Sequence, residues 1–313
     1  MRNLLPQKGD NKMKKIAISI GDINGIGLEI ALRAHKEISK ICKPVYCINR
    51  PMLEWGSAML GIDIPKGFKL KECGEVFEIK PGLNTKEAGE LSYDSFVTAI
   101  ALAKSKKVSG IVTLPINKAS WALCGIKYKG HTDALADLLG CETVMMLGCE
   151  DMYIVLYTHH IPIREISSHI EAKKLSKFLT NIYDYIKSDN IAVLALNPHA
   201  GDDGVIGDED IEIEKAIRRV NKKLKKDVFK GPLVPDTAFS EENRKHFKYF
   251  VCMYHDQGLI PLKALHFFDS INVTLNKSII RTSVDHGTAF DKAYENSKLS
   301  LVSYINAVKK AIE

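Results

Sequence analysis

The sequence lacks several features that would assign it to a class of protein at once. No apolar run is long enough to cross a bilayer, so we expect no membrane-spanning segment. None of the seven cysteines belongs to a C-x-x-C pair, and several lie in apolar segments, which is typical of reduced core residues in a cytoplasmic protein. No internal repeat, low-complexity segment or Pro/Gly/Ser-rich linker marks a domain boundary.

The chain also has no strong excess of charge of one sign. Its 44 Lys and Arg residues against 38 Asp and Glu residues give a formal net charge of +6. The basic stretch at residues 218–226 contains no interleaved aromatic residues, so we interpret it as an exposed helix face and expect no nucleic-acid partner. A mild positive bias suits an anionic small substrate. Residues 1–12 are polar and do not resemble a secretory signal; we expect a disordered tail, with Met13 as an alternative start.

Apolar strand-like segments alternate with helical ones along the chain. We expect strands at residues 15–20, 45–48, 110–114, 143–147, 152–158, 191–196, 249–254 and 271–275. We expect helices at residues 25–39, 85–104, 171–186, 208–226, 288–294 and 299–312. Thr85 is expected to cap its helix, and residues 148–151 to join a hairpin. This alternation predicts an α/β fold with a mostly parallel core sheet.

Three of the apolar runs lead into histidines. The runs at 153–158, 191–196 and 249–254 lead to the pair His159 and His160, to His199 and to His255. The carboxyl ends of parallel strands line the ligand crevice of an open α/β sheet. Three imidazoles at such ends suit a divalent metal with an open coordination position. The alternative is that each histidine bonds a nearby backbone group and has only a structural role.

A glycine-containing segment, Gly21 to Glu29, follows the first expected strand and opens a helix. Its glycines would let the backbone approach a ligand, and the helix N-terminus favours anions. The spacing is not G-x-G-x-x-G, and no acidic residue ends the second strand, so a Rossmann dinucleotide site is excluded. A plain strand-to-helix turn stays an alternative.

Two polar clusters lie near the carboxyl terminus, at residues 254–263 and 280–288. The first places a His, an Asp and a Gln between apolar flanks, and a buried polar cluster requires partners such as a ligand or metal. Lys263, Asn272 and Arg281 follow one another at intervals of nine residues and could converge on a phosphate, with Arg281 as a fork and Lys263 as a point charge. The alternative for Lys263 is an ordinary surface lysine.

Two further segments carry polar residues at expected helix starts. His131 and Thr132 could donate to an anionic ligand, Thr132 or Asp133 could cap the helix, and both can be true at once. Asp236 follows a proline ahead of an expected helix start, which suits either an N-cap or a catalytic carboxylate.

Taken together, these segments resemble the 4-hydroxythreonine-4-phosphate dehydrogenase family of pyridoxal phosphate biosynthesis. The similarity covers nearly the whole chain, through GDINGIGLE near the start, PINK at 115–118, GHTD at 130–133, LNPHAG at 196–201, PDT at 235–237, YHDQGL at 254–259 and IRTSVDHGTA at 280–289. The last two motifs are highly specific. The first departs from the family pattern, which usually has Pro-Ala in place of Ile23 and Asn24 and Pro in place of Leu28.

The resemblance implies two α/β/α domains with a cleft between them, similar to isocitrate and isopropylmalate dehydrogenases. We expect residues 1–130 and 259–313 to form the first, discontinuous domain and residues 131–258 the second. The resemblance also implies a homodimer whose active sites draw residues from both subunits. It further implies an NAD cofactor bound at a site that is not a Rossmann motif, and the preference between NAD and NADP stays open.

The resemblance further implies roles for individual residues. The metal ligands would be His160, His199 and His255, shared across the dimer, with His159 competing for the first position. The substrate contacts would be His131, Thr132, Lys263, Asn272 and Arg281. Asp236 and Lys118 are candidates for proton transfer. Zinc suits three imidazole ligands best, with magnesium or cobalt as alternatives.

The activity implied is the NAD-dependent oxidation and decarboxylation of 4-phosphooxy-L-threonine to 3-amino-2-oxopropyl phosphate, assisted by the metal, in pyridoxine 5'-phosphate biosynthesis. Two alternatives stay open. One is a dehydrogenase of another phosphorylated hydroxy acid, such as a four-carbon sugar-acid phosphate. The other is a protein like the phosphate acyltransferases, or a binding protein of similar architecture.

Overall fold

The computed structural model of the chain describes residues 13–295 and 297–313, which form two compact units. Unit 1 contains residues 13–126, most of 288–301 and residues 308–313; unit 2 contains residues 127–287 and 302–307. The tail predicted at residues 1–12 lies outside the described residues. The predicted domain division at 131 and 258 stays a prediction; by their contacts, residues 259–287 belong to unit 2. No helix in the described part of the chain is both long and apolar enough to span a membrane.

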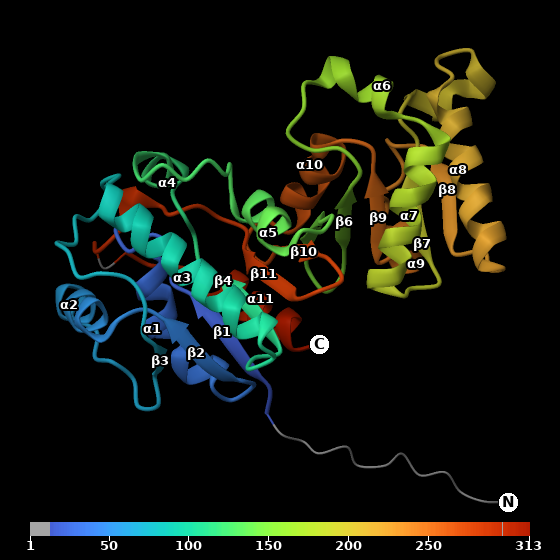
Figure 1. The fold of residues 1–313 in the computed structure, drawn as a ribbon. Coiled ribbons are helices and arrows are strands. Elements are labelled where there is room, and N and C mark those ends of the chain that lie inside the picture. Colours follow the sequence, from blue (N-terminus) through green and yellow to red (C-terminus); the bar gives the residue numbers. More distant parts are fainter. Residues whose placement is uncertain (1–12, 296) are drawn as a thin grey trace, which may run out of the picture. The chain divides into compact units, whose positions relative to one another are not determined.

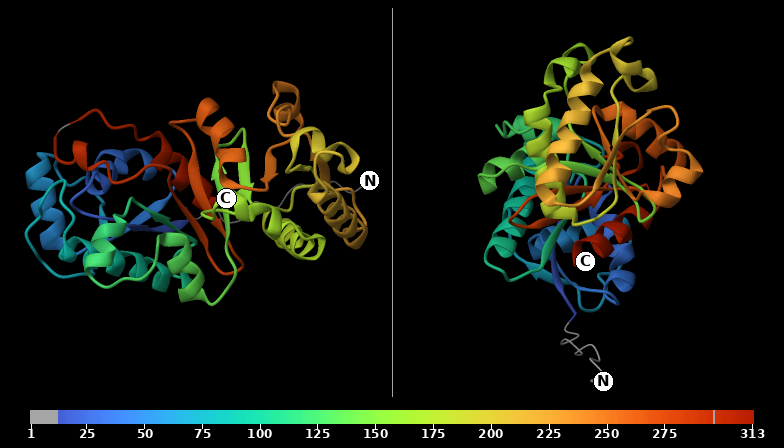
Figure 2. Two further views of the ribbon diagram at one scale, coloured as in Figure 1. Left: turned by 90° about the horizontal axis from the view of Figure 1, so that it is seen from above. Right: turned by 90° about the vertical axis from the view of Figure 1, so that its right-hand side faces the viewer.

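Unit 1 contains a parallel sheet in the order β3-β2-β1-β4 (Figure 1). Its strands are β1 (Lys15–Ser19), β2 (Lys43–Cys47), β3 (Lys69–Lys71) and β4 (Gly110–Thr113). Its connecting helices are α1 (Gly27–Ile38), α2 (Arg50–Leu60), α3 (Lys86–Lys104) and α4 (Lys118–Leu123). Because parallel strands take right-handed crossovers, the reversal of direction after β3 places α3 on the face opposite α1 (Figure 2). The carboxyl ends of β1 and β4 therefore form the switch point at which such sheets bind ligands.

The helix boundaries of unit 1 test two of the sequence predictions. Thr85 caps α3 as predicted, since its Oγ1 accepts a hydrogen bond from the Ala88 amide at 3.2 Å. The helix predicted at residues 288–294 is wrong. That segment forms only the short 3-10 turn η3 (Phe290–Lys292), because Ala289 has a φ of 44° and cannot continue a right-handed helix.

Unit 2 contains a mixed sheet in the order β11-β10-β5-β6-β9-β7-β8. Its strands are β5 (Val144–Gly148), β6 (Tyr153–Leu156), β7 (Ile191–Leu194), β8 (Phe229–Leu233), β9 (Tyr249–Cys252), β10 (Ile271–Leu275) and β11 (Ile280–Val284). The pairs from β6 to β8 are parallel, whereas β5, β10 and β11 pair antiparallel. The hairpin predicted around residues 148–151 joins β5 and β6.

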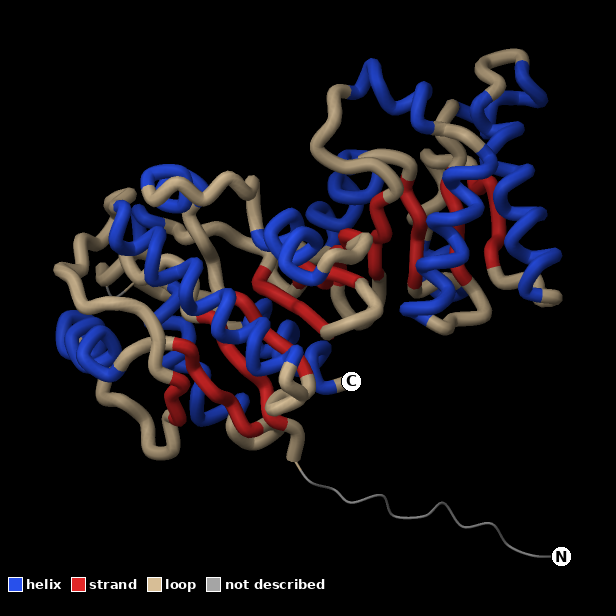
Figure 3. The backbone as a smooth tube through the Cα atoms, in the orientation of Figure 1, coloured by secondary structure: helices blue, strands red, loops and turns tan. Residues whose placement is uncertain are grey.

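Helices flank the strands within each unit, as the blue segments of the tube in Figure 3 show. Those of unit 2 are α5 (His131–Leu139), α6 (Ile166–His169), α7 (Ala172–Ile186), α8 (Glu209–Leu224), α9 (Glu241–His246) and α10 (His255–Leu265), with 3-10 turns η1 (Ile163–Glu165) and η2 (Pro198–Gly204). The final helix, α11 (Val302–Ile312), spans the boundary between the units in sequence. The basic residues of 218–226 are exposed on and just after α8, so their interpretation as a solvated face is confirmed.

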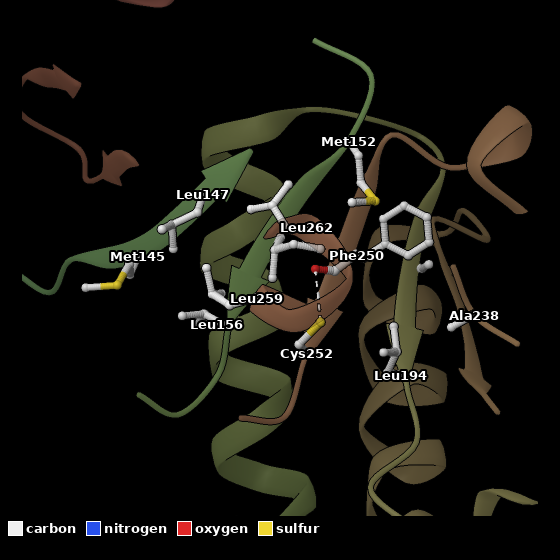
Figure 4. Close-up of a cluster of buried hydrophobic side chains, with 12 residues drawn as sticks. Met145, Leu147, Met152, Leu156, Leu194, Ala238, Phe250, Cys252, Leu259 and Leu262 are labelled. Carbon is white, nitrogen blue, oxygen red and sulfur yellow. Dashed lines mark hydrogen bonds between the residues drawn. The ribbon is translucent and has the colours of Figure 1, made fainter. Parts of the chain in front are cut away.

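One hydrophobic core of unit 2 lies between α10 and the sheet (Figure 4). Leu259 and Leu262 of α10 belong to the same buried cluster as Phe250 of β9. Gly258 makes this close packing possible, because a Cβ there would lie 2.2 Å from Ile154 Cγ2. The sheet therefore fixes where α10 lies, and with it the side chains that α10 carries.

Candidate functional site

The carboxyl ends of three parallel strands meet at one edge of unit 2. Strands β6, β9 and β7 are neighbours in that order, so the segments that follow them leave the sheet at the same edge. The alignment continues past the strand ends, since the amide and the hydroxyl of Thr158 both donate to Met253 O, at 3.2 and 2.6 Å. This pairing brings the histidines after β6 beside the histidine after β9.

Three histidine rings and one carboxylate gather at this edge. The ring centroids of His160 and His255 are 5.8 Å apart, and those of His159 and His160 are 5.1 Å apart. With Asp256 they line a pocket of about 210 Å³. We call His159, His160, His255 and Asp256 the histidine edge. His160 has a φ of 54°, a left-handed conformation that costs energy in a non-glycine residue and is concentrated at functional sites.

His255 is oriented by the residue that follows it. Its Nδ1 lies 2.7 Å from Asp256 Oδ1, and a carboxylate at one ring nitrogen is the usual means of directing the other nitrogen at a metal. His255 is the first residue of α10, and Asp256 is exposed in the first turn, so the segment 254–263 is a helix start and not the buried cluster that we expected. Gln257 joins two strand ends: its side chain accepts from Met253 N and donates to Ala195 O, both at 2.7 Å.

His159 offers a second nitrogen at the same edge. Its Nδ1 is buried and has no hydrogen-bond partner within the described residues. Burial lowers the pKa of His159, and the neighbouring His160 lowers it further, while Asp133 acts in the opposite direction. A neutral imidazole with an open nitrogen is suited to binding a cation, so His159 stays an alternative to His160 as a ligand.

His199 follows the next strand of the same edge, β7, but it has a different local structure. It is exposed in η2, in a run of five residues with left-handed backbone angles from His199 to Asp203. The buried carboxylate of Asp210 fixes the start of this run by accepting from the amides of Leu196, at 2.6 Å, and Asn197, at 3.1 Å. Within the described residues of one chain, His160, His199 and His255 do not form a group with ligand atoms within 4.8 Å of one another.

A second cluster lies on the β10–β11 hairpin and at the start of α5. Arg281 pairs across the hairpin with Thr274, and its Nη1 donates to Thr274 Oγ1 at 3.0 Å and to Asn272 Oδ1 at 3.3 Å. Burial lowers the pKa of Arg281 to about 9. An anionic ligand beside this guanidinium would favour its charged form. The structure thus brings together two of the three residues expected to converge on a phosphate.

His131 completes this anion cluster, which we define as His131, Asn272 and Arg281. His131 and Thr132 are buried in the first turn of α5, and Gly130 is the N-cap, so the expectation that Thr132 or Asp133 caps the helix is wrong. Burial holds the pKa of His131 well below its usual value, and the charge of Arg281 lowers it further. Asp133, in the same first turn of α5, raises the pKa of His159, so its charge is felt at the histidine edge.

Lys263 is held by a network that the sequence did not reveal. Its Nζ donates to the carboxylate of Asp285 and, at 3.3 Å, to Ser270 Oγ, which in turn donates to Asp285 at 2.6 Å. The Lys263 side chain is 30% exposed, so it is not an ordinary surface lysine. Asp285 lies within the second polar cluster of the sequence, which was the available signal for its involvement.

The two proton-transfer candidates lie in exposed positions. Asp236 is in a turn, and the N-cap of the helix that follows is Ser240, whose Oγ accepts from Asn243 N at 3.4 Å. The expectation of an N-cap at Asp236 is therefore wrong. Lys118 is the first residue of α4 in unit 1 and is exposed. The catalytic roles of both residues stay predictions.

The glycine-containing segment forms a tight turn at the switch point of unit 1. Gly21 has a φ of 75°, and a Cβ there would lie 2.1 Å from Pro115 O, which also accepts from the Asp22 amide at 2.8 Å. Asp22 is buried, and burial raises its pKa to about 6. Asn24 donates to Leu83 O at 2.9 Å. The polar side chains of this turn thus bind the protein's own loops.

Comparison with known proteins supports the same assignment as the motifs. The family model described as "Pyridoxal phosphate biosynthetic protein PdxA" matches residues 40–311. A protein of Sulfurimonas denitrificans named 4-hydroxythreonine-4-phosphate dehydrogenase is 53% identical over 298 residues, which are 95% of this chain and 97% of that protein. The crystal structure of the 4-hydroxythreonine-4-phosphate dehydrogenase of Klebsiella pneumoniae is 30% identical with a TM-score of 0.82, covering 96% of this chain and 98% of that one.

The likeness in fold reaches further than the likeness in sequence. A β-decarboxylating dehydrogenase of Thermococcus kodakarensis is only 12% identical, yet it has a TM-score of 0.50 over 96% of this chain and 82% of that one. At this identity the comparison concerns the fold alone, and the predicted α/β fold class is confirmed. The resemblance seen in the sequence motifs is confirmed as well, and the chain belongs to the PdxA family of pyridoxal phosphate biosynthetic proteins.

Proposed function

We propose that the chain catalyses the NAD-dependent oxidation of 4-phosphooxy-L-threonine at its 3-hydroxyl group, followed by loss of CO₂, to give 3-amino-2-oxopropyl phosphate. Membership of the family and the name of a relative 53% identical support this activity. The single observation that carries it for this chain is the buried Arg281, held by Asn272 and Thr274 beside His131. A fixed guanidinium in such surroundings suits the phosphate of a small substrate.

In this proposal the residues of unit 2 hold the two ends of the substrate. Arg281, Asn272 and His131, with Thr132, would bind one anionic end. Lys263 would bind the other as a point charge, because Asp285 and Ser270 fix its ammonium group in one place. Asp236 and Lys118 stay candidates for moving the proton of the 3-hydroxyl group.

The histidine edge fits a divalent metal. His255 has a carboxylate at Nδ1 and His159 has a buried nitrogen without a partner in the described structure, as expected where an ion binds. We propose that His160, His199 and His255 hold the ion, with His159 as the alternative to His160. Zinc suits these ligands best, with magnesium or cobalt as alternatives. When bound, the ion supplies Lewis acidity at the substrate hydroxyl group and at the ketone derived from it.

We propose that the working form is a homodimer in the cytoplasm, with the metal site completed across the two subunits. Within the described residues of one chain the three proposed ligands do not form a group close enough to hold an ion together, which supports this assembly. So does a group of exposed apolar side chains on and after α10. These are Ile260, Leu265, Phe267 and Phe268, which are 67%, 47%, 62% and 71% exposed. Such a group is typical of a surface covered by a partner.

The variant His255→Ala tests the metal site. It should lose bound metal, measured by elemental analysis, and reduce NAD at a rate at least about 100-fold below that of the natural protein. The exposed His246, whose Nε2 lies 2.9 Å from Glu242 Oε1, supplies the matched control His246→Ala, which should keep both properties. Full activity of His255→Ala in metal-free buffer would refute the proposal.

Turnover of a four-carbon sugar-acid phosphate, measured beside 4-phosphooxy-L-threonine, tests the choice of substrate.

A further inference from the structure

A second group of metal-binding side chains lies in unit 2, outside the histidine edge. Cys149, His266 and Asp269 each present one ligand atom, and these atoms lie within 4.8 Å of one another. The pairing of strands builds the group. Gly148, the last residue of β5, lies opposite Ile271, the first residue of β10. The residue that follows β5 therefore comes to lie beside the segment that precedes β10.

The turn after β5 fixes the position of Cys149. Gly148 has a φ of 153°, and a Cβ there would lie 2.1 Å from Met152 O, so the turn needs a glycine. The Cys149 amide donates to Met152 O at 3.0 Å, and the Met152 amide donates to Cys149 O at 3.2 Å. Cys149 is 4% exposed and has a free thiol. Cys149 is thus buried in a turn that two backbone hydrogen bonds close.

The segment after α10 supplies the other two ligands. The His266 amide donates to Leu262 O at 2.7 Å, and Asp269 O accepts from Asn306 Nδ2 at 3.0 Å, so both residues are anchored by their backbones. His266 Nδ1 lies 3.3 Å from Asp269 Oδ2. His266 Nε2 is buried and has no hydrogen-bond partner in the part of the chain that the structure describes. A buried ring nitrogen without a partner is costly unless a ligand fills the place of the partner.

We propose that Cys149, His266 and Asp269 form a binding site for a zinc-class divalent metal ion. One sulfur, one imidazole nitrogen and one carboxylate oxygen are each established zinc ligands, and three protein ligands leave a fourth position for water. The Cys149 thiol gives up its proton to the solvent when the ion binds. The site shares no residue with the histidine edge and does not depend on the proposed function.

The position of this site gives the ion a structural role. The loop that carries His266 and Asp269 continues into Ser270, which bonds both Lys263 and Asp285. An ion held between Cys149 and this loop fixes the end of α10 against the β5–β6 turn. It thereby stabilises the network that holds Lys263 in place.

Cobalt binding to a variant that lacks the first site tests the proposal. In His255→Ala the histidine edge is disabled, and it contains no thiol in any case. Titration of this variant with Co²⁺ should show one equivalent bound with a thiolate-to-cobalt charge-transfer band in the near ultraviolet. Adding Zn²⁺ should remove the band by displacing the Co²⁺. The double variant that adds Cys149→Ser should lack the band, whereas a matched double variant with Cys141→Ser, a partly buried cysteine of the same unit, should keep it.

The same experiment gives outcomes that overturn the proposal. Absence of the band in folded His255→Ala at stoichiometric Co²⁺, or its survival in the Cys149→Ser double variant, would do so. If the Cys149→Ser double variant does not fold, His266→Asn in the same background replaces it, with an expected loss of Co²⁺ affinity of at least about tenfold. Because every arm uses protein without His255, the band reports on this site whether or not the proposed dehydrogenase activity is correct.

Discussion

The turn after β1 in unit 1 and the hairpin of β10 and β11 in unit 2 both bury polar side chains, but they use them differently. In the turn, Asn24 donates to Leu83 O at 2.9 Å and accepts from Lys80 N at 2.9 Å, so the side chain satisfies backbone groups of a neighbouring loop. In the hairpin, Arg281 donates to the side chains of Asn272 and Thr274. The bonds of Asn24 to backbone groups therefore stabilise the fold. The bonds of Arg281 to other side chains instead fix the orientation of its guanidinium group, as a ligand site requires.

The largest expected effect is on activity, from a change in the hairpin. Arg281→Lys keeps the positive charge but loses the planar fork that Asn272 and Thr274 orient, so kcat/KM should fall at least about 100-fold. The control is Lys277→Ala, which removes an exposed cation from the turn between the same two strands and should leave kcat/KM within about twofold. Equal losses in the two variants would show that the hairpin contributes only general positive charge.

The next largest effect is on stability, from a change in the turn. Asn24→Ala removes partly buried hydrogen bonds to two loop backbone groups and leaves those groups without this partner, so the free energy of unfolding should fall by about 2–4 kcal/mol in urea titrations. The kcat of the folded protein should stay unchanged. Asn181→Ala, which removes an exposed bond to Glu142, should change stability by less than about 0.5 kcal/mol. A large fall in kcat for Asn24→Ala, with the free energy of unfolding unchanged, would show that the turn after β1 serves activity and not stability.

The smallest effect is a pH dependence of stability that arises from Asp22. Burial raises the pKa of this carboxyl to about 6, so the folded state retains a proton that the unfolded state releases near pH 4. Stability should therefore fall as pH rises from about 4 to about 6, by up to about 3 kcal/mol, and then level off. Asp22→Asn should lack this part of the profile. Urea midpoints of the two proteins at pH values below and above this window measure the difference, and parallel profiles would exclude Asp22 as the cause.

The strands of both units were predictable where they are apolar and were missed where they are short or polar. The run from Ile191 to Leu194 is buried throughout and is evident in the sequence. Strand β3 has only three residues, and β8 contains a proline at an edge of the sheet, where proline is tolerated. Strand β11 carries Arg281, whose burial no local pattern indicates. Helix α10 was missed because Gly258 and Pro261 both lower helix propensity.

The residues of the candidate sites were likewise predictable only in part. The parallel strand ends allowed the pairing of His160 with His255 to be expected, because neighbouring parallel strands finish at one edge of a sheet. The local structure of His199 could not be, since no sequence pattern indicates the run of left-handed residues that begins at it. His266 could not be assigned to a site from the sequence, because its partners depend on how β5 and β10 pair. That pairing is a tertiary contact which neither sequence segment encodes alone.

The pairing of β5 with β10 has a consequence for how this chain can change in evolution. A single-residue insertion in β10 would turn Asn272 to the opposite face of the sheet and shift Asp269 away from Cys149, so both clusters would be lost together. The turn between β10 and β11 is under no such constraint, because a longer loop there preserves the alignment of both strands with β5. Length variation among natural variants should therefore accumulate in the turn at residues 276–279 and be absent from the strand beside it.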